Sequence, residues 1–165
     1  MIFVTVGTHE QPFDRLVSKV DELVESGAIR EEVFIQTGYS TYEPKHCAWS
    51  KMLPYSEIAE KVAQARIVIT HGGPSSFIMP LQLGKTPIVV PRQARFGEHV
   101  NDHQVEFSGE VARRHGSILV VEDTENLANV IADYDALAEQ TSGGISSNNP
   151  AFMEVFEKIV QELLG

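Results

Sequence analysis

Short runs of consecutive apolar residues recur along the chain, and stretches with helical spacing separate them. The runs cover residues 2–6, 33–37, 65–70, 87–91 and 117–121. Strands without alternating polar residues are typical of a parallel sheet whose two faces are both covered by helices. The sequence therefore predicts an α/β fold, a Rossmann-like parallel sheet with helices on both faces.

The segments between these runs carry apolar residues at helical spacing or a residue that caps helices. Helices are predicted over residues 13–24, 56–63 with Ser56 as the cap, 77–83, 101–115, 124–132 with Thr124 as the cap, and 151–164. Residues 141–149 are rich in Gly, Ser and Asn and are predicted to form a loop. With 165 residues and no long linker, the chain is predicted to form a single domain, residues 1–165.

Composition disfavours several classes of function. Thirteen basic and 23 acidic residues give a net charge of −10, which disfavours binding to nucleic acid and to anionic membrane surfaces. The single cysteine, Cys47, cannot form an internal disulfide or a cysteine-based zinc site. No apolar run approaches the roughly 20 residues of a membrane span, and the first residues run into a strand pattern without a basic leader. We therefore expect a cytoplasmic protein.

The charge is unevenly distributed along the chain. Residues 61–121 carry seven basic and four acidic side chains, a net charge of +3, whereas the segments on either side are both acidic. A small phosphorylated ligand responds mainly to nearby charge, whereas a long polyanion responds to the whole protein. The middle segment is therefore the expected location of an anion site.

The sequence His-Gly-Gly-Pro-Ser-Ser follows the third apolar run, and loops that follow parallel strands are where such sheets bind ligands. Gly72 and Gly73 allow close approach of the backbone to an anion. The exposed amides and the hydroxyls of Ser75 and Ser76 are expected at the positive end of a helix, and His71 can add a proton or a positive charge. We predict a phosphate site here. The alternative is an ordinary tight turn with a capping serine.

The connection after the fourth apolar run is densely polar and offers groups that could bind sugar hydroxyls. Its polar side chains include Arg92, Gln93, Arg95, His99, Asn101, Asp102, His103 and Gln104. A solvated loop with a helix cap at Asn101 explains the same residues. His99, Asp102 and His103 match no standard zinc spacing, so no metal site is predicted.

Polar residues also follow the first apolar run. Gly7 and Thr8 can form a pocket of backbone donors at the same edge of the sheet, and His9 and Glu10 offer acid–base groups. A polar start of the next helix is an equally good interpretation.

Taken together, these segments resemble the C-terminal domain of glycosyltransferase family 28 over nearly the whole chain. Within that family the chain resembles most the small catalytic (PssE-type) subunits of two-component bacterial exopolysaccharide transferases. It also resembles the catalytic subunit of the eukaryotic enzyme that adds the second N-acetylglucosamine to a dolichol-linked sugar. The matching segments are Gly7-Thr8-His9, Pro12-Phe13-Asp14-Arg15-Leu16, Gln36-Thr37-Gly38, His71-Gly72-Gly73-Pro74-Ser75-Ser76, Gly84-Lys85 and Asn101-Asp102-His103-Gln104.

The resemblance implies the donor-binding half of a GT-B glycosyltransferase that uses a UDP-sugar and neither a cofactor nor a metal. The diphosphate would lie at residues 71–76, and His9 would be the local candidate for the catalytic base beside His71. Residues implied at the uracil are Leu53, Pro54 and Tyr55, and those implied near the ribose or the donor sugar are Asn101, His103 and Gln104.

The resemblance also implies a partner, because the chain matches only one half of such an enzyme. A membrane-anchored subunit would bind the acceptor, a polyprenyl-diphosphate-linked sugar, and would recruit the chain to the inner face of the membrane. The predicted helix over residues 151–164 could dock this subunit or pack on its own core, and the sequence favours the core.

The chain departs from the family pattern at one position. Many donor domains carry a ribose-binding glutamate eight residues after the position of His71, where this chain has Met79. Gln82 or residues 101–104 could replace that contact, or the ribose could be held more weakly. Met79 also leaves open a non-catalytic nucleotide-sugar-binding or scaffold module of the same fold.

Overall fold

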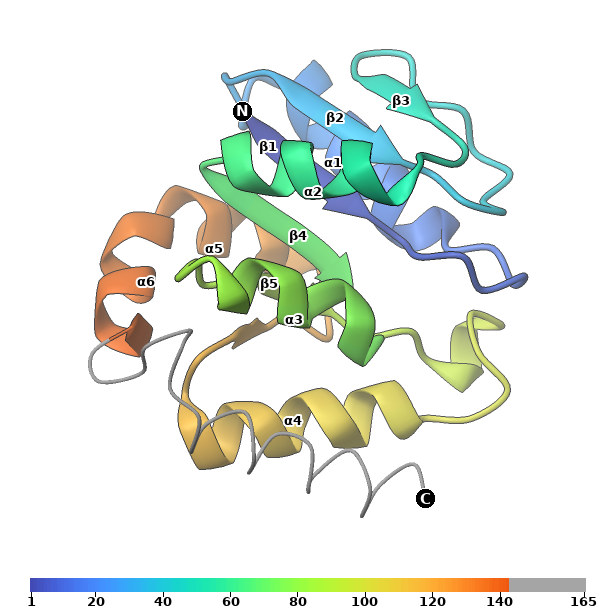
Figure 1. The fold of residues 1–165 in the computed structure, drawn as a ribbon. Helices are drawn as coiled ribbons and strands as arrows, with labels where there is room; N and C mark the ends of the chain where they lie inside the picture. The colour runs from blue at the N-terminus through green and yellow to red at the C-terminus, as the bar shows by residue number, and fades with distance from the viewer. Residues whose placement is uncertain (143–165) are drawn as a thin grey trace.

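Six strands form one parallel sheet in the computed structural model, which describes residues 1–142 (Figure 1). Each neighbouring pair of strands is parallel, which confirms the predicted sheet. Five strands coincide with the predicted apolar runs, and β3, at one edge, was not predicted. In spatial order the strands are β3 (Ala48–Ser50), β2 (Val33–Gln36), β1 (Ile2–Thr5), β4 (Ile67–His71), β5 (Ile88–Val90) and β6 (Leu119–Val120).

Helices occupy most of the connections between strands, and two short 3₁₀ turns complete them. The helices are α1 (Asp14–Glu25), α2 (Tyr55–Gln64), α3 (Pro74–Gln82), α4 (His103–His115), α5 (Leu127–Ala132) and α6 (Tyr134–Ser142), and the turns are η1 (Ala94–Phe96) and η2 (Thr124–Asn126).

Successive residues of the strands point to opposite faces of the sheet, and both faces are buried. On β1, Ile2 and Val4 join the core formed with α1, α5 and α6, whereas Phe3 joins the core formed with α2. On β5, Val89 packs with α3 and α4. Figure 1 shows α2, α3 and α4 together on one side of the sheet. The prediction of helices on both faces is therefore confirmed.

Several predicted helix starts are wrong by a few residues. Helix α2 begins at Tyr55, so Ser56 is not its cap; Pro54 precedes the helix with φ −57°, and its carbonyl accepts the first helical bonds. Thr124 does not cap the next long helix either. The carboxylate of Asp123 instead accepts from the Glu125 amide at 3.0 Å and stabilises η2, and α5 begins only after it.

The chain beyond α5 differs from the prediction. Helix α6 was not predicted, and it includes residues 141 and 142, where a loop was expected. The remainder of that loop and the predicted helix over residues 151–164 lie outside the described residues. Among residues 1–142, no helix has both the length and the apolar character that a membrane crossing requires.

Lys85 closes the C-terminal end of α2 from another part of the chain. Its Nζ donates to the carbonyls of Val62, Ala63 and Ala65 at 2.8, 2.8 and 2.5 Å. The last carbonyls of a helix have no partner within the helix, and a cation there interacts favourably with the helix dipole. Lys85 therefore joins α2 to the turn that follows α3.

We expect Lys85→Met to lower the free energy of unfolding by about 1–3 kcal/mol, because three carbonyls would lose a charged donor. Urea unfolding followed by circular dichroism measures this change. Lys45→Met is the matched control, because Lys45 is exposed and, within residues 1–142, only its main-chain amide has a partner. It should change stability by less than about 0.5 kcal/mol. Equal effects of the two substitutions would contradict the role of Lys85.

Candidate functional site

A pocket of about 470 Å³ lies at the carboxyl ends of β1 and β4. The chain leaves β1 toward β2 and β3 and then returns to form β4 on the other side of β1. At such a reversal the two flanking loops turn away from each other and leave a crevice, where open α/β sheets bind ligands. The predicted loops after the first and third apolar runs therefore meet at one site.

The pocket has one polar wall and one apolar wall. The polar wall comes from the loop after β1 and from the first turns of α3 and α4, and it includes Thr8, Ser75, Ser76 and Gln104. The apolar wall comes from α2 and α3 and includes Tyr55, Ile58, Val62 and Met79. A ligand with an anionic part and a flat, less polar part fits this division.

The side chain of His71 lies at the bottom of the pocket, 7% exposed, between the loops that follow β1 and β4. A Cβ added at Gly7 or at Gly73 would lie 2.3 Å from a ring atom of His71. Its Nε2 is 2.8 Å from the Ser76 hydroxyl. The two glycines are thus required by close packing against the imidazole.

The pKa of His71 is lowered from its ordinary value to about 3. Burial is the main cause, because it disfavours the charged ring, and the nearby positive charge of Arg92 adds to it. The imidazole is therefore neutral at pH 7. It does not supply the positive charge that the sequence suggested.

Helix α3 begins at this loop, with Pro74 in its first turn as predicted. Some of the amides expected to face an anion are engaged inside the protein. Gly72 donates to Gln104 Oε1 at 3.0 Å, and Ser76 donates to the Gly73 carbonyl at 3.0 Å. Besides His71, the residues of this loop that line the pocket are the two serines, beside the positive end of the α3 dipole.

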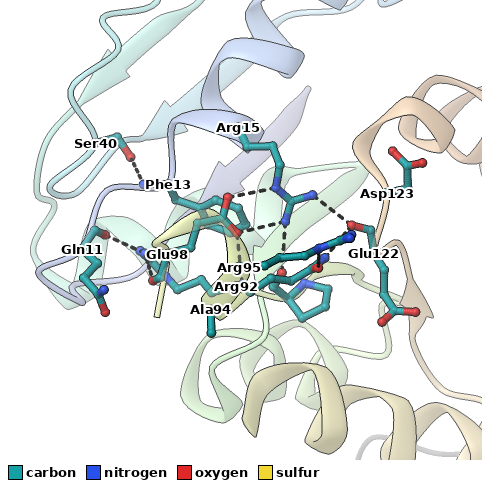
Figure 2. Close-up of polar contacts among 12 residues, drawn as sticks. Gln11, Phe13, Arg15, Ser40, Arg92, Ala94, Arg95, Glu98, Glu122 and Asp123 are labelled. Carbon is teal, nitrogen blue, oxygen red and sulfur yellow. Dashed lines mark hydrogen bonds and ion pairs between the residues drawn. The ribbon is translucent and has the colours of Figure 1, made fainter. Parts of the chain in front are cut away.

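A buried cation, Arg92, follows β5 and acts electrostatically on His71 (Figure 2). The guanidinium of Arg92 has no exposed surface and donates to the carbonyls of Val6 at 2.7 Å, Gln11 at 2.6 Å and Glu98 at 3.1 Å. It also lies 5.0 Å from the centre of the Phe13 ring. Burial lowers the pKa of Arg92 to about 10, so the side chain remains charged at pH 7.

The carboxylate of Glu98 is also buried, and it organises the loop that contains Arg92. Arg15 binds its two oxygens at 2.9 and 3.0 Å, and the Gln93 amide donates to it at 3.1 Å. Arg15 extends further to the carbonyl of Glu122 at 2.9 Å, as Figure 2 shows. The loop after β5 is thereby attached to α1 and to the segment after β6.

The positive charge of residues 61–121 is mostly directed away from the pocket. Arg66 pairs with Glu31 and Asp135, and Arg113 and Arg114 pair with Glu110. None of the basic residues of this segment lines the pocket, although Arg92 acts electrostatically on His71, which lines it. The sum of charges along the sequence therefore did not predict how the site would receive an anion.

His9 lines the pocket, and its Nε2 is 2.8 Å from Oε1 of Gln11. Its ring stacks on that of His99 with the centroids 4.5 Å apart. Burial, together with His9, Arg92 and His103, lowers the pKa of His99. The structure therefore joins the loop after β1 to the loop after β5 at the edge of the pocket.

The residues predicted for the uracil and the sugar are only partly brought together. Tyr55 lines the large pocket, whereas Leu53 and Pro54 do not. His103 and Gln104 line a neighbouring pocket of about 170 Å³. Asn101 is in neither pocket, and its side-chain oxygen accepts from the His103 amide at 3.0 Å.

Met79 lines the large pocket, whereas Gln82 is exposed and lies outside it. Gln36 belongs to one of the segments that resemble the family, and the structure places it, buried, in the pocket wall. Its Nε2 donates to the carbonyls of Gly7 at 3.1 Å and Lys51 at 2.8 Å.

The part of the chain that the structure describes contains no group of three or more His, Cys, Asp or Glu side chains arranged to hold a metal ion. His99 and His103 are near each other, but Asp102 is directed elsewhere and accepts from the Ala94 amide at 2.9 Å.

We expect Gly73→Ala to destabilise the protein by about 1–3 kcal/mol, because the added methyl group would displace the buried imidazole. Gly109→Ala is the matched control. A Cβ at Gly109 meets nothing within 4 Å, and within α4 alanine should stabilise the protein by about 0.5–1 kcal/mol relative to glycine. Urea unfolding measures both changes. The same sign for the two variants would contradict the packing argument.

Arg92→Met should lower the free energy of unfolding by about 3–5 kcal/mol, because the substitution leaves the buried carbonyls of Val6, Gln11 and Glu98 without their charged donor. The control is Arg95→Met, in a neighbouring residue that is exposed. It should cost less than about 1 kcal/mol. Thermal unfolding of the two variants side by side tests the difference, and comparable losses would be incompatible with it.

Comparisons with known proteins agree on the fold. The sequence matches the family described as the glycosyltransferase family 28 C-terminal domain over residues 1–162. No curated protein matches the chain.

Several solved glycosyltransferases share this fold. SnogD from Streptomyces nogalater has a TM-score of 0.55 and 15% identity, and the match covers 99% of this chain and 39% of that one. The spinosyn forosaminyltransferase SpnP has a TM-score of 0.58 and 13% identity, covering 99% and 42%. SsfS6 from Streptomyces sp. SF2575, solved with thymidine diphosphate, has a TM-score of 0.53 and 16% identity, covering 99% and 41%.

At these identities the likeness concerns the fold, and the chain spans about two-fifths of the length of each of these structures. The shared part is the Rossmann-like C-terminal half of a GT-B glycosyltransferase. The sheet order, the pocket at its reversal and the match over residues 1–162 lead to the same conclusion: the chain belongs to glycosyltransferase family 28, to its C-terminal domain.

Proposed function

We propose that the chain is the donor-binding, catalytic subunit of a UDP-sugar-dependent glycosyltransferase. It transfers a hexose from the UDP-sugar to a polyprenyl-diphosphate-linked sugar in exopolysaccharide or capsule biosynthesis. A membrane-anchored subunit holds that acceptor and recruits the chain to the inner face of the membrane. The two subunits correspond to the two halves of a GT-B enzyme.

The observation that most strongly supports binding of a nucleotide diphosphate is the division of the pocket into a polar and an apolar wall. The serines at the start of α3 offer hydroxyl donors and the positive end of a helix dipole to the diphosphate. Tyr55, Ile58 and Met79 offer an apolar surface to the base. The neighbouring pocket of about 170 Å³, beside His103, is the size of a small group such as a sugar ring.

In this proposal the donors of the pocket take the place of a metal. When the bond between C1 of the sugar and the phosphate oxygen breaks, its electron pair stays on UDP, and negative charge grows on the diphosphate. Fixed donors and a helix dipole aimed at that charge stabilise it without a cation in contact with it. Arg92 acts electrostatically on His71, which lines the pocket, and so adds a positive charge close to the diphosphate.

His9 is the candidate for the base that accepts the proton of the acceptor hydroxyl as the new bond to C1 forms. The amide nitrogen of Gln11 donates to the Gly97 carbonyl at 3.3 Å, so its oxygen faces Nε2 of His9. Nε2 therefore carries the hydrogen in the neutral ring, and Nδ1 is the nitrogen that can accept a proton.

Exposed apolar residues around the pocket support a protein partner that covers it. Five of the six large apolar residues that are exposed in the described part of the chain follow the carboxyl ends of strands: Tyr39, Met52, Tyr55, Phe96 and Val100. The related solved enzymes contain more than twice as much chain as this one. The acceptor-binding half is therefore the occupant proposed for this rim.

The alternative is a nucleotide-sugar-binding or scaffold module without catalytic activity. Met79 favours it, because this side chain occupies the pocket wall and cannot accept a hydrogen bond from ribose as a carboxylate would. The two functions differ in whether the chain supports sugar transfer that depends on His9.

Titration calorimetry with the purified chain should show saturable binding of UDP, and Gly73→Ala should weaken it at least about tenfold, the equivalent of one good hydrogen bond. Gly109→Ala should bind like the unchanged chain. Absence of UDP binding by the folded chain would contradict the donor site.

Transfer of a radiolabelled sugar from its UDP derivative to lipid extract should require both the chain and a membrane fraction that contains the partner. His9→Gln should reduce this transfer about 100-fold or more, the usual contribution of a general base, while UDP binding persists. Binding of UDP without transfer under any condition would favour the scaffold module. Transfer that His9→Gln leaves unchanged would show that another group is the base.

A further inference from the structure

The imidazole of His71 is held in place by main chain from two loops. Gly7 follows β1 and Gly73 precedes α3, and a Cβ on either would come within 2.3 Å of the ring. The side chain is almost completely buried, although it forms part of the pocket floor. The plane of the ring is therefore fixed, and hydrogen bonds decide which nitrogen carries the hydrogen.

Hydrogen bonds of Gln104 show that Nδ1 of His71 carries no hydrogen. Its Oε1 accepts from the main-chain amides of Gly72 and Arg92, both at 3.0 Å, so its amide orientation is fixed by two donors. The Nε2 group of Gln104 consequently faces Nδ1 of His71 at 3.3 Å. The Gly73 amide donates to the same atom at 3.2 Å. Because two N–H groups converge on Nδ1, this nitrogen presents its lone pair.

The hydrogen of the neutral ring is therefore on Nε2, which lies 2.8 Å from Oγ of Ser76. Nε2 donates, and the serine oxygen accepts. A hydroxyl that accepts in this way keeps its own hydrogen for another partner. Ser76 lines the pocket at the start of α3, so that hydrogen is available to a ligand there.

The groups that act electrostatically on the ring are all basic. Arg92 at the end of β5, His9 in the loop after β1 and His99 in the loop after β5 each disfavour a second proton on His71. Burial, the largest cause of the lowered pKa, acts in the same direction. The geometry and the surrounding charges thus agree on a neutral imidazole.

We infer that His71 is a positioning residue for the bound diphosphate: it donates from Nε2 to Ser76, and the Ser76 hydroxyl, rather than the imidazole, donates to the diphosphate. The identity of the ligand rests on the proposed function, whereas the protonation state of the ring does not.

The state of the ring can be measured without any ligand. Long-range ¹H–¹⁵N spectra of the labelled chain, with His71 assigned through its backbone, should show a neutral ring with hydrogen on Nε2 at every pH from about 5.5 to 8.5, a range in which an ordinary histidine titrates near 6.5. The lower limit stays above the sequence pI of about 5.0. His46, whose side chain is 41% exposed, is the internal control for an imidazole outside the pocket. A titrating His71, or hydrogen on Nδ1, would overturn the inference.

Binding of UDP-glucose tests the role of the serine. A UDP-sugar is preferred to UDP because a terminal phosphate itself titrates near about pH 6. Ser76→Ala and His71→Ala should each weaken binding about tenfold, and the double variant should be no weaker than either alone, because both remove one donor. His71→Gln, which keeps an N–H group and never carries a charge, should recover most of the loss.

Three results would overturn the positioning role: additive losses in the double variant, unchanged affinity of Ser76→Ala, or affinity of the unchanged chain that rises on acidification through about pH 6.5 as a cationic histidine requires. His46→Gln is the control for substitution of a histidine outside the pocket. If UDP-glucose does not bind at all, the proposed function fails, and the spectra still decide the state of the ring. If His71→Gln does not fold, the spectra of the unchanged chain and the Ser76→Ala affinity decide.

Discussion

The charge of Arg92 is buried at the carboxyl edge of the sheet, and the loops around the pocket are arranged about it. It donates to carbonyls of the loop after β1, at Val6 and Gln11, and of the loop after β5, at Glu98. Removing a charge from water costs several kcal/mol unless hydrogen bonds replace the lost hydration. Nε of Arg92 has no partner among the described residues, and movement of either loop would also break bonds that Nη1 and Nη2 make. This single side chain therefore holds both sides of the pocket in one arrangement.

The same charge explains how an acidic protein can present a site for an anion. In the interior, charges are screened less than in water, so Arg92 influences groups that it does not touch. It disfavours the protonated form of His71, and it provides a positive charge close to the pocket that Ser75 and Ser76 line. The net charge of −10 acts at longer range, where salt screens it. A compact ligand inside the pocket is therefore influenced mainly by the nearby charge of Arg92 and less by the net charge of the protein.

The parts of the fold that depend on burial could be predicted from the sequence. Strands such as Ile67–His71 are buried throughout and appear as apolar runs, whereas β3 is a half-exposed edge strand of three residues with no such run. The loop at residues 71–76 is local in sequence, so its role as a helix start was predictable. The role of Arg92 was not, because Gln11 and Val6, which it binds, lie 81 and 86 positions away. The net charge of a segment likewise does not show which of its side chains point toward the pocket.

The glycines of the site are better explained by the imidazole than by a phosphate. Gly7, with φ of 76°, and Gly73 belong to loops after two adjacent strands between which the sheet order reverses. Both approach the ring of His71 so closely that no side chain fits. The ring in turn holds Ser76, whose hydroxyl faces the pocket. The neutral side chain of His71 therefore forms the floor of the crevice at the reversal of the sheet order. The group that contacts the ligand is the Ser76 hydroxyl, and the packing of His71 between the loops after two strands sets its direction.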